Sequence, residues 1–195
     1  MVPQRIERDI LIDAPMEIVW AVVTEPEHIS GWFSDSVDLD LRPGGAAALS
    51  WDDYGTVRGR VERVEPPHFF SFRWVVHRDP GAPVRDGNST LVEFSLSPEG
   101  DATRLTVVES GFRDLSGSED ENQGHVDGHR RGWDLELGEL QEYAEKRMRA
   151  GRRPPPSPRS TSCGPRSAIP PAAACSTSSS TAARRPRPWS PASCR

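Results

Sequence analysis

The chain has 195 residues, with 24 Lys and Arg against 29 Asp and Glu, for a formal net charge of −5. Nine arginines and no acidic residue fall within residues 149–195, so residues 1–148 carry a net −14 and the remainder a net +9. An acidic domain binds duplex DNA poorly, because neutralisation of phosphates by basic side chains supplies much of the affinity of proteins for DNA. The sequence contains no run of about 18 apolar residues, the length needed to cross a membrane. We therefore expect partners other than nucleic acid and membranes.

The last part of the chain, residues 149–195, differs in composition from the rest. It holds ten Pro, ten Ser, nine Arg and eight Ala, with Ile169 and Trp189 as its only large apolar side chains. Such a segment buries too little apolar surface to offset the entropy lost on ordering its backbone. We expect one domain over residues 1–148 and a disordered tail over residues 149–195. GC-rich codons encode the same residue types, so a shifted reading frame is an alternative origin for the tail.

The cysteines bear on compartment and metal content. Cys163, Cys175 and Cys194 all lie in the tail, at spacings that match no zinc motif. A domain without cysteine needs no disulfide and suits a reducing compartment, and the first eight residues lack the apolar stretch of a secretory signal. The sequence predicts a cytoplasmic protein. With no phosphate-binding glycine-rich loop either, we expect no metal and no cofactor.

The first elements are a strand and two helices. Alternating apolar residues predict a strand over residues 5–12. Asp13 is a favoured capping residue and Pro15 suits a first helical turn, so an apolar helix should follow. Residues 25–31 predict a second, short helix, after which Trp32 and Phe33 are expected to plug the core.

Strand patterns dominate the middle of the chain. Six strands are predicted, over residues 37–41, 46–51, 56–64, 68–76, 90–96 and 105–109. The turns between them are rich in Gly, Pro and Asp, which suit turn geometry. Residues 116–124 are acidic and polar and predict a loop. A helical period then runs from about residue 126 to residue 148. Its apolar stripe is Trp133, Leu137, Leu140 and Ala144.

This element order predicts an α+β fold rather than a parallel α/β fold. An antiparallel sheet needs its apolar face covered, and the C-terminal helix is the only predicted element long enough to cover it. We therefore expect a curved antiparallel sheet wrapped around a long C-terminal helix, with a cavity between the two.

Short segments spread over residues 5–147 carry a family resemblance. They are ILIDAPMEIVW at 10–20, TEPE at 24–27, WF at 32–33, PGG at 43–45, the strand and turn at 59–67, VESGF at 108–112 and GW at 132–133. Taken in this order, they resemble proteins related to the C-terminal domain of the activator of Hsp90 ATPase, in the START/SRPBCC helix-grip superfamily. The resemblance implies the helix-grip fold, with two short helices after the first strand.

The resemblance also implies classes of function. Members of this superfamily bind lipids, hormones and polyketides, and a few catalyse cyclisation or dehydration. Eukaryotic Hsp90 activators carry a separate N-terminal domain that engages the chaperone, and this chain matches only the other domain. A bacterial binding protein for a small hydrophobic or aromatic molecule is therefore the leading hypothesis. A protein-interaction module related to Hsp90 co-activators and a homodimer stay open as alternatives.

The candidate ligand-binding residues are aromatic and apolar side chains with one carboxylate among them. They are Trp20, Trp32, Trp51, Phe72, Trp74, Phe94, Glu109, Trp133 and Leu137. Tryptophans supply large, semi-rigid walls, and pockets for small molecules are mostly apolar with few polar anchors. The alternative for each of these residues is core packing.

Glu109 is the candidate polar anchor and the candidate catalytic residue. It shares a strand face with Leu105 and Val107, so its carboxylate should point toward the cavity. Burial raises the pKa of an unpaired carboxylate into the range that acid–base catalysis uses. A cyclase, dehydratase or hydrolase is thus the enzymatic alternative, although we expect a binding protein. A structural hydrogen bond to a tryptophan N–H, to Arg8 or to a loop backbone is the other interpretation.

Two histidines, His125 and His129, have the four-residue spacing of helical metal ligands. Val126 stands where a metalloprotease helix would carry its glutamate, and Gly128 weakens the helix. We therefore expect both histidines to be exposed to solvent near the start of the last helix, with no metal site.

Overall fold

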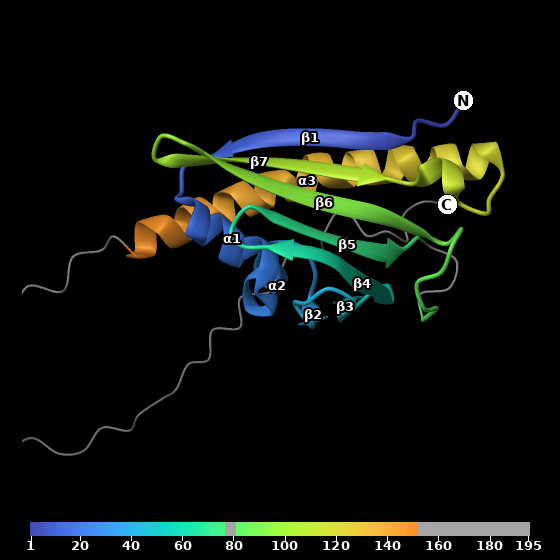
Figure 1. Ribbon diagram of the computed structural model, residues 1–195, viewed down its shortest axis with the longest axis horizontal. Coiled ribbons are helices and arrows are strands. Elements are labelled where there is room, and N and C mark those ends of the chain that lie inside the picture. The colour runs from blue at the N-terminus through green and yellow to red at the C-terminus, as the bar shows by residue number, and fades with distance from the viewer. Residues whose placement is uncertain (77–80, 152–195) are drawn as a thin grey trace, which may run out of the picture.

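In the computed structural model, residues 1–76 and 81–151 are described. Seven strands form one antiparallel sheet in the order β1-β7-β6-β5-β4-β3-β2 (Figure 1). Their bounds are β1 Arg5–Ile12, β2 Ser36–Leu39, β3 Ala46–Trp51, β4 Gly55–Glu65, β5 Phe69–Val75, β6 Ser89–Glu99 and β7 Ala102–Ser110. The prediction of one strand before the helices and six after them is confirmed.

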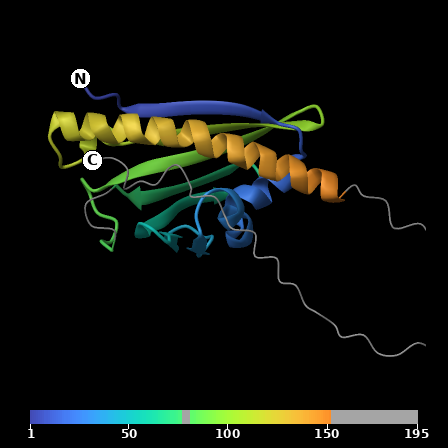
Figure 2. The same cartoon turned by 180° about the vertical axis from the view of Figure 1, so that it is seen from behind.

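The helices lie on one face of this sheet. Their bounds are α1 Met16–Thr24, α2 Pro26–Trp32, the 3-10 helix η1 Phe112–Asp114 and α3 Glu119–Gly151. Figure 2 shows α3 running along the face of the curved sheet, with α1 and α2 beside its C-terminal half. The predicted α+β architecture, a curved sheet that grips a long helix, is confirmed. Within the described part of the chain, no helix has both the length and the hydropathy to cross a membrane.

The alternation of apolar residues along the strands determines which face is covered. On β7, Leu105, Val107 and Glu109 are fully buried while the residues between them are half-buried. On β5, Phe70, Phe72 and Trp74 occupy the same covered face. Because side chains alternate across a strand, each period-two apolar pattern delivers its large residues to the interior under α3.

Sheet curvature has a local cause on β4. The pairing of β4 with β5 shifts register between Val61 and Arg63, which is a β-bulge. Next to it, Gly59 lies so close to β5 that an added Cβ would stand 2.7 Å from the Arg73 carbonyl oxygen. Bulges and strand glycines of this kind let a sheet bend sharply.

Two predicted helix starts are wrong. The N-cap of α1 is Pro15, and no side chain caps this helix, so Asp13 does not have the capping role predicted for it. The predicted loop at 116–124 is helical from Glu119 onward, because Ser118 and Glu121 form a reciprocal capping box. The Glu121 backbone N–H donates to Ser118 Oγ, and the Ser118 N–H donates to Glu121 Oε2. Acidic residues in that first turn also favour the positive end of the helix dipole.

The C-terminal boundary is partly outside the described residues. Residues 149–151 continue α3 rather than belonging to the tail that was expected to begin there. The remainder of the predicted tail, residues 152–195, lies outside the residues that the structure describes, as do all three cysteines.

Candidate functional site

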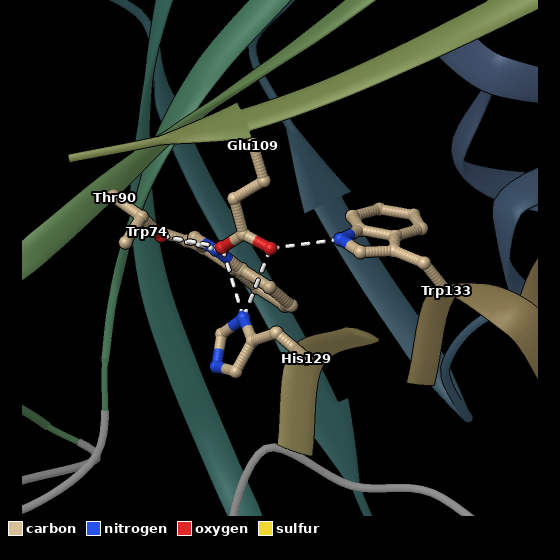
Figure 3. A network of polar contacts seen from close by, with 5 residues as sticks. All are labelled: Trp74, Thr90, Glu109, His129 and Trp133. Atoms are coloured by element: carbon tan, nitrogen blue, oxygen red, sulfur yellow. Dashed lines mark hydrogen bonds and ion pairs between the residues drawn. The ribbon is translucent and has the colours of Figure 1, made fainter. Parts of the chain in front are cut away.

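Glu109 lies at the centre of a buried polar network between the sheet and α3 (Figure 3). Its position on the inward face of β7 directs the carboxylate toward α3, and its side chain is 0% exposed. Two strand neighbours, Trp74 on β5 and Thr90 on β6, approach one side of the carboxylate. Trp133 and His129, one helical turn apart on α3, approach from the other side.

Four side chains donate hydrogen bonds to this carboxylate. Oε1 accepts from Thr90 Oγ1 at 2.6 Å and from Trp74 Nε1 at 2.8 Å. Oε2 accepts from Trp133 Nε1 at 2.7 Å. His129 Nδ1 lies 2.9 Å from Oε1 and 3.0 Å from Oε2, so a protonated His129 forms a buried ion pair with Glu109. Buried carboxylates are costly unless they are paired in this way.

The electrostatics of Glu109 follow from its neighbours. Burial alone would raise the pKa of Glu109, but the charge of His129 and the hydrogen bonds from the surrounding donors outweigh it. The pKa of this carboxyl group therefore lies below its usual value. A general acid needs the opposite shift, so the geometry fits an ionised anchor that ties β5, β6 and β7 to α3.

The expected exposure of the two histidines is wrong. His129 is 0% exposed and His125 is half-buried. Because α3 begins at Glu119, His129 lies well inside the helix, and it precedes Trp133 by four residues on the same stripe. Among the residues that the structure describes, no group of three or more His, Cys, Asp or Glu side chains is placed to hold a metal ion.

Phe33 joins the four buried tryptophans of the described residues into one aromatic cluster. Its ring centroid lies 5.0 Å from that of Trp32 and 5.8 Å from that of Trp51. It lies 5.9 Å from Trp74, and it stacks on Trp133 at 5.8 Å with an interplanar angle of 8°. The predicted plugging of the core by Trp32 and Phe33 matches this arrangement. Through Trp133, the aromatic cluster is continuous with the Glu109 network.

An apolar pocket of about 30 Å³ lies next to this cluster, where α2 faces the sheet. Its wall consists of Val23, Ile29, Trp32, Phe33, Val37, Leu39, Ala47, Leu49, Phe70, Phe72 and Phe94. The volume is that of about one or two water molecules. The predicted cavity between sheet and helix is therefore largely filled by side chains.

The structure brings only part of the predicted ligand set to this pocket. Trp32, Phe72 and Phe94 line it, whereas the other six candidates are not part of its wall. Trp51, Trp74, Glu109, Trp133 and Leu137 are buried elsewhere in the core, and Trp20 is half-buried against the core's edge. The sequence predicts a core position for Phe33 but no role in a site, and no pattern in it predicts the aliphatic wall from α1, α2, β2 and β3.

Two larger hollows lie near the residue 85–87 loop. One, of about 330 Å³, includes Val76, Leu115 and Asn122, and the other, of about 980 Å³, includes Arg60, Arg73 and Leu91. Neither is lined by a predicted site residue.

Comparison with known proteins agrees with the fold. The family model described as activator of Hsp90 ATPase homolog 1-like protein matches residues 13–145. Protein MLL2253 from Mesorhizobium loti is 26% identical with a TM-score of 0.61, over 73% of this chain and 98% of that one. CalU16 from Micromonospora echinospora is 29% identical with a TM-score of 0.54, over 75% of this chain and 79% of that one. No curated protein matches significantly.

A more distant structure shows the fold alone. The Aha1 dimer from Colwellia psychrerythraea is 15% identical with a TM-score of 0.57, over 72% of this chain and 96% of that one. The family model spans α1 through most of α3, and so includes the pocket wall and the Glu109 network. The chain belongs to the activator of Hsp90 ATPase homolog 1-like family.

Proposed function

We propose that this protein binds a small, uncharged apolar or aromatic molecule in the pocket between α2 and the sheet. The observation that carries the proposal is the composition of the wall, in which all eleven residues are apolar. The wall extends from α2 and the short strands β2 and β3 to the central strands β5 and β6, which contribute Phe70, Phe72 and Phe94. Binding pockets for small molecules are concave and mostly apolar.

The wall also restricts the chemistry of the ligand. No lining residue carries a charged or hydrogen-bonding side chain apart from Trp32, whose Nε1 already donates to the Val22 carbonyl at 3.0 Å. A charged or strongly polar group in this pocket would lose its hydration without gaining a partner. The ligand portion that enters is therefore a hydrocarbon chain or an aromatic ring.

Ligand entry requires the pocket to enlarge, because drug-sized ligands occupy pockets of about 300–1,000 Å³. Part of the wall is suited to this. β2 has four residues and lies at the sheet edge, and α2 has seven residues. Short edge elements open locally at lower free-energy cost than central strands.

A pocket-filling substitution tests the proposal. Ala47→Leu adds bulk at the wall, and Ala46→Leu adds the same bulk at the neighbouring, exposed position on β3. We expect an apolar ligand at about 100 times its Kd to raise the stability of the wild type and of Ala46→Leu by about 2.7 kcal/mol. Ala47→Leu should weaken binding at least about tenfold, because extra methyl groups strain a packed site. Thermal-shift titration with a panel of neutral aromatic compounds measures both effects.

Either of two results would contradict ligand binding at this pocket. One is that no neutral aromatic or aliphatic compound shifts the melting temperature of the wild type. The other is that Ala47→Leu and Ala46→Leu bind a ligand equally well, which would place the ligand elsewhere.

A further inference from the structure

We propose that α2 is the movable wall of the pocket, that Tyr143 on α3 holds it closed, and that an aromatic ring of the ligand takes the place of Phe33 when α2 withdraws. The inference rests on the proposed function, since it describes how the same pocket admits its ligand. It rests on three sets of contacts, which concern the outer side of α2, its inner side and the site of the Phe33 ring.

The outer side of α2 lies against Tyr143. A Cβ added at Gly31 would overlap Tyr143 Cε2 and Cζ, so the helix backbone and the tyrosine ring are in direct contact. Tyr143 Oη lies 3.3 Å from Nδ1 of the buried His28, also on α2. His28 Nε2 in turn lies 3.4 Å from Glu25 Oε2 at the N-cap of the same helix. Tyr143 therefore contacts α2 by both its ring and its hydroxyl group.

The inner side of α2 carries part of the pocket wall. Ile29 and Trp32 project from the helix into the wall, and Phe33 is the C-cap residue. The Phe33 carbonyl accepts a hydrogen bond from Trp51 Nε1 at 3.2 Å. The seven-residue helix has no side-chain hydrogen bond at its N-cap. A helix this short has little stability of its own and depends on tertiary contacts. Movement of α2 would thus move three wall residues together.

The Phe33 ring occupies a slot bounded by indoles. It stacks on Trp133 at 8° and meets Trp51 edge-on at 72°. Trp74 closes another side, tilted at 35°. Offset-stacked and edge-to-face contacts of this kind favour a flat aromatic ring beyond simple burial. Withdrawal of Phe33 would leave a slot that accepts a neutral aromatic ring better than an alkyl chain.

A substitution at Gly31 tests the contact with Tyr143. Gly31→Ala places a methyl group against the Tyr143 ring and should force α2 away from α3. Gly31 does not have a positive φ, so alanine fits its backbone. In ligand-free protein, we expect hydrogen exchange of the α2 amides to accelerate at least about tenfold relative to α1. In a Tyr143→Ala background, Gly31→Ala should add less than about twofold, because the overlap is gone.

Binding kinetics test whether this motion admits the ligand. N-phenyl-1-naphthylamine, a neutral aromatic probe, can be followed by stopped-flow fluorescence. If opening of α2 limits entry, the association rate of the probe rises in Gly31→Ala by the same factor as the hydrogen-exchange rate of the α2 amides. Both rates are proportional to the fraction of molecules in which α2 is open. Tyr54→Phe, at the other tyrosine of the chain, is the matched control and should change neither rate. Tyr143→Phe removes only the hydroxyl group and should accelerate both the α2 amide exchange and the probe association by about two- to fivefold. This variant replaces Gly31→Ala in the test if Gly31→Ala does not fold.

Three outcomes overturn the inference in distinguishable ways. Unchanged α2 exchange in both Gly31→Ala and Tyr143→Phe shows that Tyr143 does not hold the helix. Faster exchange with unchanged probe association shows that α2 is not the entrance, while the proposed function stands if the wild type still binds the probe. If the wild type does not bind the probe, both the proposed function and the replacement of Phe33 by a ligand ring are contradicted. The hydrogen-exchange rates of the α2 amides then still decide whether Tyr143 holds α2.

Discussion

Replacing Glu109 with glutamine lowers the free energy of unfolding by about 3–5 kcal/mol, the range for breaking one side of a buried ion pair. The substitution keeps the side-chain size but sets an amide NH2 group among four donors, at hydrogen-bond distances of 2.6–3.0 Å. It also removes the negative charge that faces His129. Urea denaturation at pH 7 measures the loss. Glu93→Gln, at a half-buried position on the outer face of β6, is the control and should change stability by less than about 1 kcal/mol.

The effect of Glu109→Gln should depend on pH. The pKa of Glu109 is lower in the folded protein than in the unfolded chain, because His129 and the hydrogen-bond donors favour its charged form. The stability that this carboxylate contributes is therefore fully present above its unfolded-state pKa, near 4.3, and is lost as the pH falls through the folded-state pKa. The difference between wild type and Glu109→Gln should shrink on acidification below about pH 4. A difference that stays constant down to acid pH would show that the carboxylate's charge contributes nothing.

Phe33→Ala should cost about 3–5 kcal/mol of folding stability, the usual range for deleting a buried aromatic ring. Phe33 is 2% exposed and contacts four tryptophans, so its removal leaves a cavity bounded by rigid indoles that cannot collapse easily. Addition of benzene should restore part of the loss, because an apolar cavity of this kind binds small aromatic molecules. Urea denaturation with and without benzene measures both effects.

Phe69→Ala provides the control for this cavity. Phe69 is half-buried at the start of β5, with the Arg63 guanidinium 4.7 Å from its ring centroid. Its loss should cost less than about 2 kcal/mol, and benzene should not restore it. If the two substitutions lower folding stability equally, or if benzene restores the stability of Phe69→Ala, the claim that Phe33 fills a rigid cavity bounded by indoles is contradicted.

The strands and their inward faces could be predicted from the sequence because local alternation determines them. Leu105, Val107 and Glu109 share the predicted face, and the large residues of β5 face the same interior. The start of α3 differs from the prediction, because the polarity of residues 116–124 indicates a loop while the helix begins at Glu119. The Ser118-to-Glu121 spacing of a capping box, visible in the sequence, would have placed the helix start correctly.

The candidate site could be predicted only in part. The strand pattern predicts that the Glu109 carboxylate faces inward, but its partners Trp74 and Thr90 come from other strands, and no local pattern predicts which residues meet. His129 could have been found, because it stands four residues before Trp133 on the apolar stripe of α3. The pocket wall could not be predicted, because its residues come from two helices and four strands that are distant in sequence. Which of these elements meet is a tertiary property, set by packing rather than by a local pattern.

Intermolecular NOEs between N-phenyl-1-naphthylamine and methyl-labelled protein test the location of the bound ligand most directly. Ligand binding at the α2 pocket predicts NOEs from the probe's aromatic protons to the methyl groups of Val23, Ile29 and Leu49, which all line that pocket. NOEs to Val84 and Leu91 instead would place the ligand in the hollow of about 980 Å³ near residues 85–87. That result, or the absence of NOEs to any pocket methyl group at saturating probe, would contradict ligand binding between α2 and the sheet.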